Sequence, residues 1–478
     1  MTSTEAWAAY PPTYRAQELQ TLAAWIATGQ SSSVVGLVGC GRSSLLDFLC
    51  HRPDALQRYL PKAERVVLLQ VDIYNLPTND LASLCRTILH SFYWERERFA
   101  GTLAQSVTEL YLENRALIDP FLPQKALYEL ILLFQKERLQ VVLVLNRFDR
   151  FCATATLQMV NNLRGLRDNF KNTLSYIVGM QQEALYLGDP AMLGDMYELL
   201  DSHVCLVGRL SESDAYSQLL HVLRATATPP TLEEVADLLQ LSGNFPSLLK
   251  AVGQWWLMNP QRPTTLAAWC EQLLTESSIE YRLDRIWNGL TQEEKLALAE
   301  VQKLQLRTGT RRTGSGRIGK EAPASAGEEA EQTRLLERLA AKGLCTCVDK
   351  HWQINGILLN AYIARFEGRV PGKIWLDEQT HMIYQGQQPI EELTGLQYEI
   401  LCFLVKNPRV RHTRDDIIDN GWPDVDQREG ITPNALQVHI AAIRKRIEPR
   451  PSAPRYLLTW HGRPGGYQFF PEGKPEPE

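Results

Sequence analysis

Apolar and polar positions follow two different periods along the first 208 residues. Five short apolar runs have the length and the composition of buried strands. The segments between them carry apolar residues at helical spacing, as Leu19, Leu22 and Ile26 do. Strands that alternate with helices predict a parallel sheet with helices on both faces. The predicted strands are residues 33–38, 66–71, 141–145, 175–178 and 203–207.

The strand pattern stops after Gly208, and two further regions follow. The residues after Gly208 have the pattern of successive helices, including 232–239 and 244–256. This pattern predicts a helical lid beside the α/β domain. After the lid, helices followed by hairpin patterns predict two winged helices. A chain of 478 residues is too long for one core, so a multidomain α/β plus α+β protein is expected. The predicted domains are residues 1–208 (parallel sheet), 209–285 (lid), 286–366 (internal winged helix) and 372–470 (second winged helix).

The first winged helix opens with Thr291 and Glu294, which form a capping-box pattern. Gly343 is the expected C′ residue of a later helix. That helix carries Glu337 and Arg338 but no basic run, so we expect an internal packing module and not a second DNA reader. Residues 308–332 have almost no apolar side chains and predict a disordered insert. The predicted hairpin strands are residues 344–348 and 351–354.

Composition narrows the class of protein. The formal net charge is −5, so any nucleic-acid contact must come from a local basic patch. The apolar runs are far shorter than the roughly 20 residues of a membrane helix, and residues 1–5 do not begin a secretory signal. The nine cysteines are scattered, which suits a reducing cytosol. We expect a cytoplasmic bacterial protein with no membrane partner.

A glycine-rich segment at residues 36–43, Gly-Leu-Val-Gly-Cys-Gly-Arg-Ser, lies between a predicted strand and a predicted helix. It matches G-x-x-x-x-G-K-[ST] except at Arg42, which replaces lysine. In this motif backbone N–H groups and a helix N-terminus surround phosphates. The context favours a P-loop over a plain strand-to-helix turn, and ATP or ADP is the expected cofactor. The candidate contacts are Gly36, Gly39, Gly41, Arg42, Ser43, Ser44, Asn146 and Asp149.

The residues after the strand at 141–145 depart from those of active P-loop ATPases, which usually have Asp and then Glu. This chain has Asn146 and Arg147. An amide lacks the negative charge that magnesium favours, and a guanidinium is no base near neutral pH. Asp149 keeps a carboxylate nearby, although it could equally cap a helix. We therefore expect weak ATPase activity at most and doubtful magnesium binding, and we assign no catalytic residue and no other metal.

Residues 15–365 resemble the STAND and AAA+ class of P-loop ATPases, through the loop, the strand at 141–145 and one further stretch. Residues 241–249, Leu-Ser-Gly-Asn-Phe-Pro-Ser-Leu-Leu, are similar to the lid motif that reaches the nucleotide in this class. Phe245 stands where the family often has His. The resemblance implies a switch in which bound nucleotide sets the arrangement of lid and winged helix. A simple turn between two helices is the alternative interpretation of residues 243–246.

A series of features follows in order along residues 372–470. They are the hairpin at 374–384, Leu393-Thr394, Asn407-Pro408, residues 413–415, Trp422, and residues 438–446 and 456–467. This series resembles the OmpR/PhoB-type winged helix, and the resemblance implies binding to double-stranded DNA. One departure lies in the wing, where the family usually has Thr-x-Arg-Gly-x-Gly-Tyr. This chain has a longer segment at 459–467, with His461 at the usual arginine position and Arg463 two residues beyond.

The segment from Thr432 predicts the recognition helix, with Thr432 as N-cap and Pro433 as the first helical residue. Its outer face mixes residues that can meet base edges, thymine methyl groups and phosphates. The alternative role for the basic run at 444–446 is to complement the helix C-terminus. The predicted inward positions are Leu436, Ile440, Ile443 and Ile447. The candidate DNA contacts are Asn434, Gln437, Val438, Ala441, Arg444, Lys445 and Arg463.

These features together predict a transcriptional regulator in which a hydrolysis-poor P-loop module controls a C-terminal winged helix. Its expected partners are double-stranded DNA and an unidentified effector, and a homo-oligomer is a further candidate assembly. Two other hypotheses remain open. One is an active STAND-type ATPase that remodels DNA or a partner in a defence or mobile-element system. The other is a DNA-binding scaffold that keeps the P-loop fold without using nucleotide.

Overall fold

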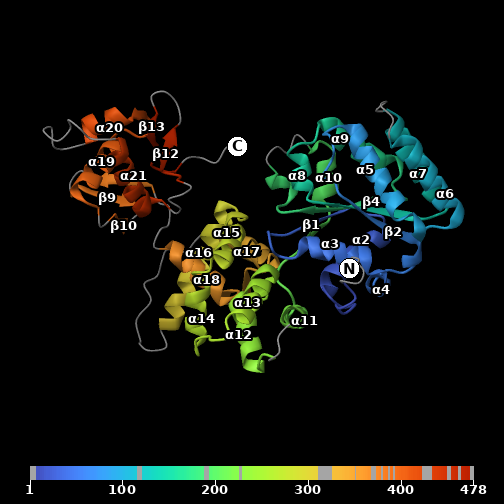
Figure 1. Ribbon diagram of the computed structural model, residues 1–478, viewed down its shortest axis with the longest axis horizontal. Coiled ribbons are helices and arrows are strands. Elements are labelled where there is room, and N and C mark those ends of the chain that lie inside the picture. The colour runs from blue at the N-terminus through green and yellow to red at the C-terminus, as the bar shows by residue number, and fades with distance from the viewer. Residues whose placement is uncertain are drawn as a thin grey trace. The chain divides into compact units, whose positions relative to one another are not determined.

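The computed structural model divides the chain into two compact units, Met1–Ala361 and Tyr362–Glu478, which are described separately (Figure 1). The finer division into four domains stays a prediction. The described residues are 7–115, 121–187, 193–224, 229–310, 326–349, 351–367, 373–377, 380–385, 388–390, 393–421, 433–448, 454–460 and 465–473.

The first unit is built on a five-stranded sheet with the order β2-β3-β4-β1-β5. All neighbouring strands pair in parallel, so the predicted parallel sheet is confirmed. Each strand overlaps one of the predicted apolar runs. The strands are β1 (Ser32–Val35), β2 (Val66–Val71), β3 (Gln140–Asn146), β4 (Leu174–Met180) and β5 (Val204–Leu206).

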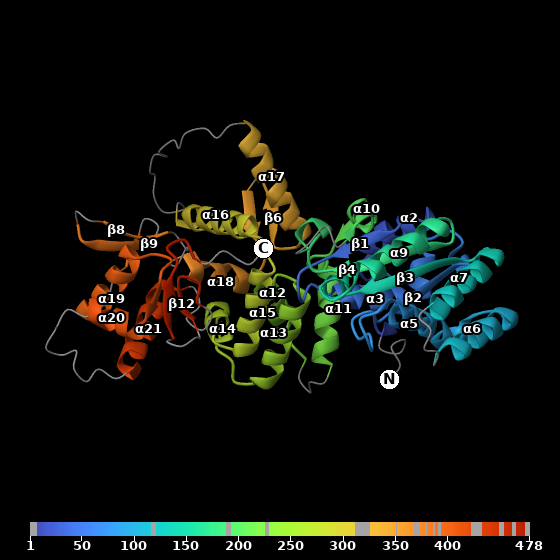
Figure 2. The same ribbon diagram turned by 90° about the horizontal axis from the view of Figure 1, so that it is seen from above.

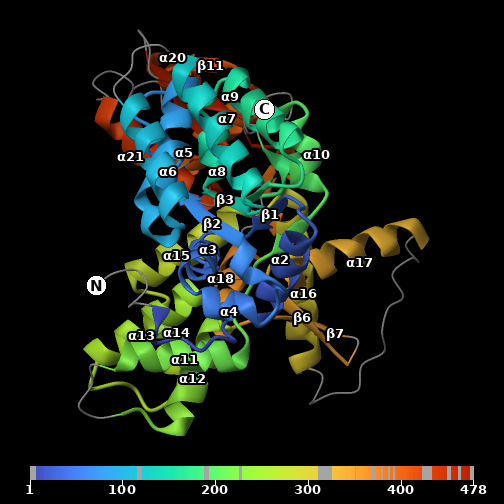
Figure 3. The ribbon, with the colours of Figure 1, turned by 90° about the vertical axis from the view of Figure 1, so that its right-hand side faces the viewer.

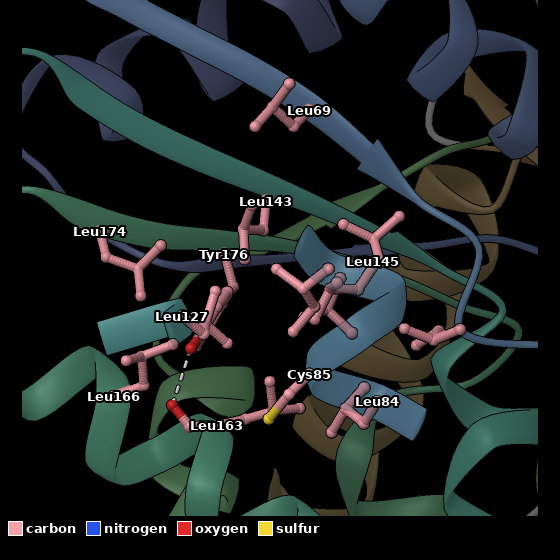
Figure 4. Packing of buried hydrophobic residues seen from close by; sticks show 14 of the residues in the cluster. Leu69, Leu84, Cys85, Leu127, Leu143, Leu145, Leu163, Leu166, Leu174 and Tyr176 are labelled. Atoms are coloured by element: carbon pink, nitrogen blue, oxygen red, sulfur yellow. Dashed lines mark hydrogen bonds between the residues drawn. The ribbon is translucent and has the colours of Figure 1, made fainter. Parts of the chain in front are cut away.

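Helices cover both faces of this sheet, as predicted. Helices α2, α3 and α4 lie on one side, and α5 to α10 lie on the other (Figures 1 and 3). On the second side, Leu143 and Tyr176 of the sheet point toward leucines of α5, α7 and α9 (Figure 4). The Tyr176 hydroxyl, buried there, donates a hydrogen bond to the Leu163 carbonyl at 2.7 Å. The helices are α2 (Ala16–Ala27), α3 (Arg42–His51), α4 (Pro53–Gln57), α5 (Leu81–Trp94), α6 (Gly101–Asn114), α7 (Phe121–Lys136), α8 (Phe148–Cys152), α9 (Leu157–Asn169) and α10 (Met196–Asp201).

The predicted helical lid is present as five helices, of which α12 and α13 pack side by side (Figure 2). The predicted helix at 244–256 begins later than expected, at Pro246. Gly243 and Asn244 have φ angles of 59° and 61°, so they form a left-handed turn that ends α12. The lid helices are α11 (Glu212–Leu223), α12 (Leu232–Ser242), α13 (Pro246–Met258), α14 (Leu266–Leu273) and α15 (Ser277–Asn288).

The internal winged-helix segment contains the predicted hairpin, with β6 (Cys345–Val348) antiparallel to β7 (His351–Ile354). The prediction that residues 308–332 are disordered is wrong at both ends of this segment. Helix α16 (Gln292–Thr310) extends into it, and α17 (Ala326–Ala341) begins before it ends. Alanine and glutamate in the first turns of α17 favour a helix despite the lack of large apolar residues. Residues 311–325 lie outside the described residues. The next helix is α18 (Ile357–Glu367).

A buried ion-pair network joins this segment to the end of β4. The predicted capping box at Thr291 and Glu294 is confirmed by both reciprocal hydrogen bonds. The Glu294 carboxylate, fully buried, also lies 2.6 Å from Lys342 Nζ, which is 1% exposed. Arg338 of α17 pairs at 2.8 Å with Glu183, which follows β4. These contacts support the expectation that the segment is a packing module of the first unit.

Glycine backbones make two further contacts between the winged-helix segment and the lid. A Cβ on Gly343, whose φ is +79°, would lie 2.2 Å from the backbone nitrogen of Arg209. A Cβ on Gly243 would lie 2.7 Å from the nitrogen of Gly356. Because no side chain fits at these positions, the two backbones approach directly. The predicted C′ role of Gly343 is consistent with its left-handed backbone.

The second unit has two antiparallel three-stranded sheets, with the orders β10-β9-β8 and β11-β13-β12. The predicted leading hairpin is confirmed by β8 and β9. Thr394 and Gln397 form a complete capping box at the start of α19. The elements are β8 (Ile374–Asp377), β9 (Met382–Gln385), β10 (Gln388–Pro389), α19 (Gly395–Lys406), β11 (Arg411–Thr413), α20 (Arg414–Gly421), α21 (Pro433–Ile447), β12 (Leu457–Trp460) and β13 (Gly466–Phe469).

Within the described ranges, no helix combines the length and the apolar character needed to span a membrane.

Replacing Lys342 by Met tests the buried network, because it removes the 2.6 Å partner of the buried Glu294 carboxylate and leaves, among the described residues, only Arg338 Nε at 3.5 Å. We expect Lys342→Met to destabilise the first unit by about 3–5 kcal/mol, as loss of one partner of a buried pair does. Lys125 pairs with Glu129 at 3.6 Å and is 60% exposed, so Lys125→Met should cost less than about 1 kcal/mol. Differential scanning calorimetry measures both. Equal effects of the two substitutions would show that the network does not stabilise the unit.

Candidate nucleotide site and DNA interface

The glycine-rich segment has the predicted strand–loop–helix context. It leaves β1 at Val35 and enters α3 at Arg42. Gly39 and Gly41 have φ angles of +90° and +88°, which L side chains rarely adopt. The loop backbone therefore has a shape that requires glycine at these two positions. This geometry supports the P-loop interpretation over a turn of arbitrary sequence, while nucleotide contact by these residues stays a prediction.

The N-terminus of α13 packs directly on the loop. The backbone N–H of Ser247 donates to the Gly39 carbonyl at 3.0 Å. A Cβ on Gly39 would lie 2.2 Å from Ser247 Oγ, and one on Gly41 would lie 3.4 Å from Pro246 Cγ. The turn at 243–246 is thus both a turn between helices and the segment that brings the lid to the loop.

Arg42 is buried against the loop to which it belongs. Its Nη1 donates a long hydrogen bond of 3.4 Å to the Gly36 carbonyl. Its Nε is buried without a hydrogen-bond partner in the described part of the chain. Burial lowers the pKa of Arg42, and the neighbouring Asp149 carboxylate opposes this shift. The guanidinium stays charged, since even a lowered arginine pKa is far above neutral pH.

The side chains at the expected magnesium positions bond to each other. Asn146 Nδ2 donates to Ser43 Oγ at 3.0 Å, and Asn146 Oδ1 accepts the backbone N–H of Arg147 at 2.9 Å. The structure therefore brings these two predicted site residues together. Asp149 lies on α8, with its Oδ1 buried and without a hydrogen-bond partner among the described residues. Its carboxylate does not line the cavity described next.

A cavity of about 720 Å³ lies over the loop, between the sheet and the lid. Of the predicted residues, Gly39, Gly41, Arg42, Ser43 and Ser44 line it. No carboxylate belongs to its lining among the described residues, and the cationic side chains come from four separate helices or helix ends. These cations are Arg42, Arg147, Arg150, Lys250 and Arg285.

Of these cations, Arg147 was considered only as the replacement of a catalytic base. Arg150, Lys250 and Arg285 were not predicted to reach this cavity. Arg150 lies one helical turn after Arg147, and that spacing could have placed both on one side of α8. Lys250 and Arg285 are on α13 and α15. No local signal links them to a loop some two hundred residues earlier.

Arg15 is a second residue that the sequence analysis missed. It is 2% exposed and has a left-handed backbone with φ of 56°. Its Nη2 donates to the Cys40 carbonyl in the loop at 2.6 Å, and both Nη atoms reach the Gly208 carbonyl at 3.1 Å. Its backbone N–H donates to Asp214 on α11. One side chain thus joins the phosphate-binding loop to the start of the lid.

In the second unit, α21 has the predicted orientation. Its inward leucine and isoleucines are at most 1% exposed, whereas Gln437, Ala441 and Lys445 are exposed. Val438 is 66% exposed on the outer face of the helix, so its side chain is accessible to a partner. Asn434 lies in the first turn of α21, and Arg463 and Thr432 lie outside the described residues.

Arg444 is turned toward the wing. Its Nε and Nη2 donate to the Leu457 carbonyl of β12 at 3.0 and 2.7 Å, and Nη2 also donates to Thr459 Oγ1 at 2.8 Å. Burial lowers its pKa. The structure therefore shows Arg444 holding β12 against α21, and a DNA contact by Arg444 stays a prediction.

Glu448 fixes the start of the same strand. Its carboxylate is fully buried and accepts the backbone N–H groups of Arg455, Tyr456 and Leu457 at 2.6, 2.9 and 2.7 Å. Burial raises the pKa of Glu448, and the three N–H donors oppose this shift. The sequence pattern does not predict this role for Glu448, because its three partners lie seven to nine residues further along the chain.

The second unit thus has the fold of a winged helix, with a recognition helix and a hairpin fixed to it. Residues 387–469 match the sequence model of the family "Transcriptional regulatory protein, C terminal". The unit contains a transcriptional-regulator-type DNA-binding domain.

Curated relatives are similar to about a fifth of the chain. The probable transcriptional regulator ycf27 of Porphyridium aerugineum is 28% identical over 98 residues, which are 20% of this chain and 39% of that protein. The DNA-binding response regulator MtrA of Mycolicibacterium smegmatis is 28% identical over 100 residues, or 21% of this chain and 41% of that protein. The chain thus spans about two fifths of these relatives.

Among solved structures, the chain is similar to the Walker-type ATPase PABY2304 of Pyrococcus abyssi. That structure is 14% identical, with a TM-score of 0.42, over 73% of this chain and 95% of that chain. The parallel α/β fold of the first unit is defined by its own strand order and glycine loop.

Glu448→Gln tests how the wing is held. A glutamine has one acceptor oxygen and a donor –NH2 group, so it cannot serve three N–H donors. We expect amide exchange at Arg455, Tyr456 and Leu457 to accelerate about tenfold or more, because a hydrogen bond to a charged group contributes about 1.5–3 kcal/mol. Glu399 on α19 is exposed, so Glu399→Gln serves as the control. Unchanged exchange at the three amides in Glu448→Gln would contradict this role.

Proposed function

We propose that the protein is a cytoplasmic transcriptional regulator whose P-loop module binds ATP or ADP and controls DNA binding by the second unit. The observation that carries the nucleotide part is the cavity over residues 36–44. It combines a glycine loop, the N-terminus of α3 and five cations. Backbone N–H groups, a helix dipole and positive side chains are the features that bind phosphates.

Hydrolysis is at most weak in this proposal. Asn146 replaces the usual aspartate and donates a hydrogen bond to the Ser43 hydroxyl. The negative charge that a carboxylate would offer a magnesium ion is therefore missing. Arg147 replaces the usual glutamate and cannot polarise a water as a base. The same observations weigh against the alternative of an active remodelling ATPase.

The DNA contacts are proposed on the exposed face of α21 and in the wing. Gln437 and Lys445 offer hydrogen bonds to bases and phosphates, and Val438 offers an apolar contact. Arg444 and Glu448 act as positioning residues, since they hold β12 to α21. Asn434, Ala441 and Arg463 complete the proposed surface.

A nucleotide can control DNA binding only if the chain has two states and each ligand binds one of them with higher affinity. The nucleotide strengthens DNA binding if both ligands prefer the same state, and weakens it if they prefer opposite states. The contacts of Arg15 support such coupling within the first unit, because they join the loop to Gly208 at the start of the lid. The backbone contact between Gly343 and Arg209 extends this connection to the winged-helix segment. A change at the loop can thus reach the end of the first unit. An effector or a second copy of the chain would act on the same equilibrium.

DNA affinity measured with and without nucleotide tests the proposal. A duplex is first selected from a random-sequence library by the full chain, and its Kd is then measured by fluorescence anisotropy. We expect saturating ATP to change the Kd by about fivefold or more, the lower end of typical coupling. Lys250→Glu reverses one exposed charge in the cavity, so it should remove the ATP effect.

Three other results would be informative. ATP binding with an unchanged Kd for DNA would contradict control by the P-loop module. DNA binding without any ATP binding would favour the nucleotide-independent scaffold. Rapid ATP turnover coupled to DNA binding would favour the remodelling ATPase.

A further inference from the structure

The cavity over the P-loop contains unbalanced positive charge. In the described part of the chain, none of its five cations forms an ion pair, and no carboxylate lines it. Elsewhere in the first unit, by contrast, Arg15, Arg52 and Arg338 each pair with a carboxylate. Several unpaired cations around one cavity raise the local concentration of anions and bind them by charge-assisted hydrogen bonds.

The donor set of this cavity does not suit a divalent cation. Magnesium is held in proteins by carboxylates together with phosphate oxygens and water. Here the Asn146 amide nitrogen, which is a donor, faces Ser43 Oγ, and Asn146 Oδ1 is used by the N–H of Arg147. Among the described residues, no three His, Cys, Asp or Glu side chains lie together as a metal-binding group.

Two of the guanidinium groups that line the cavity are held by one aromatic ring. Arg147 and Arg150 lie with their Cζ atoms 5.3 and 5.5 Å from the ring centroid of Tyr74, which follows β2. Arg150 Nη1 also donates to the Tyr74 hydroxyl at 3.3 Å. Arg147 directly follows Asn146, and its left-handed backbone is fixed by the hydrogen bond from its N–H to Asn146 Oδ1. Cation–π contacts of this kind hold an arginine in place without neutralising its charge.

We propose that this site takes the metal-free nucleotide polyphosphate in preference to its magnesium complex, with Arg147 and Arg150 supplying the positive charge that magnesium supplies elsewhere. The inference rests on the proposed nucleotide binding. A free triphosphate carries more negative charge than its magnesium complex, so a cavity with five cations and no carboxylate favours the free anion. Tyr74 acts as a positioning residue for both guanidinium groups.

Isothermal titration of the full chain with ATP, in EDTA and in excess magnesium, tests this inference. We expect binding in EDTA, and a Kd about tenfold weaker in magnesium, which corresponds to about 1.4 kcal/mol. Arg147→Gln should weaken binding in EDTA and remove most of the difference between the two buffers. Arg58→Gln changes an exposed arginine outside the cavity, and it should match the unchanged chain.

A third variant, Asn146→Asp, restores the usual carboxylate with almost no change in shape. We expect magnesium to strengthen its ATP binding, which reverses the response of the unchanged chain. Circular dichroism confirms folding of each variant.

The outcomes separate the two claims. Binding that requires magnesium in the unchanged chain would overturn the inference and leave nucleotide binding intact. An Arg147→Gln variant that binds as the unchanged chain does would overturn the assignment of Arg147. No ATP binding in either buffer, by a folded protein, would overturn both the inference and the proposed nucleotide switch.

Discussion

The buried guanidinium of Arg15 is the constraint on which the arrangement of the first unit depends. It donates to carbonyls of the phosphate-binding loop and of the lid start, at Cys40 and Gly208. Both carbonyls are buried and need donors, since an unsatisfied buried polar group is costly. The loop and the lid start therefore share one partner. The N-terminus of α13 then packs on the loop. The backbone of Gly343 lies against the backbone of Gly208 and Arg209, and this contact joins the winged-helix segment to the lid start.

Periodicity predicted most of the fold because the local pattern and the buried faces agree. All five strands, the lid helices α12 and α13, the 345–354 hairpin and the inward face of α21 could be found in this way. The errors lie where local pattern and structure differ. Residues 326–332 lack large apolar side chains and are helical, and Asn244 forms a turn in a segment that looks helical.

The candidate sites were less predictable, because they depend on residues far apart in the chain. The loop and Asn146 could be identified from a motif, but Lys250 and Arg285 reach the same cavity only through the packing of the lid. Arg444 was predicted as a DNA contact from charge and helical position. The structure shows it hydrogen-bonded to β12. The spacing of residues along the helix does not predict this contact. Glu294 was recognised as a helix cap, and its pairing with Lys342 was not foreseen.

In the proposed function the P-loop module binds a nucleotide and hydrolyses it slowly at most. The most direct test is the chemical state of the bound nucleotide. The full chain is incubated with ATP, separated from free nucleotide, and its bound nucleotide is identified by chromatography after increasing times. We expect most of the bound nucleotide to remain ATP over times in which an ordinary ATPase completes many turnovers. Steady conversion to ADP at the rate of an ordinary ATPase would contradict it.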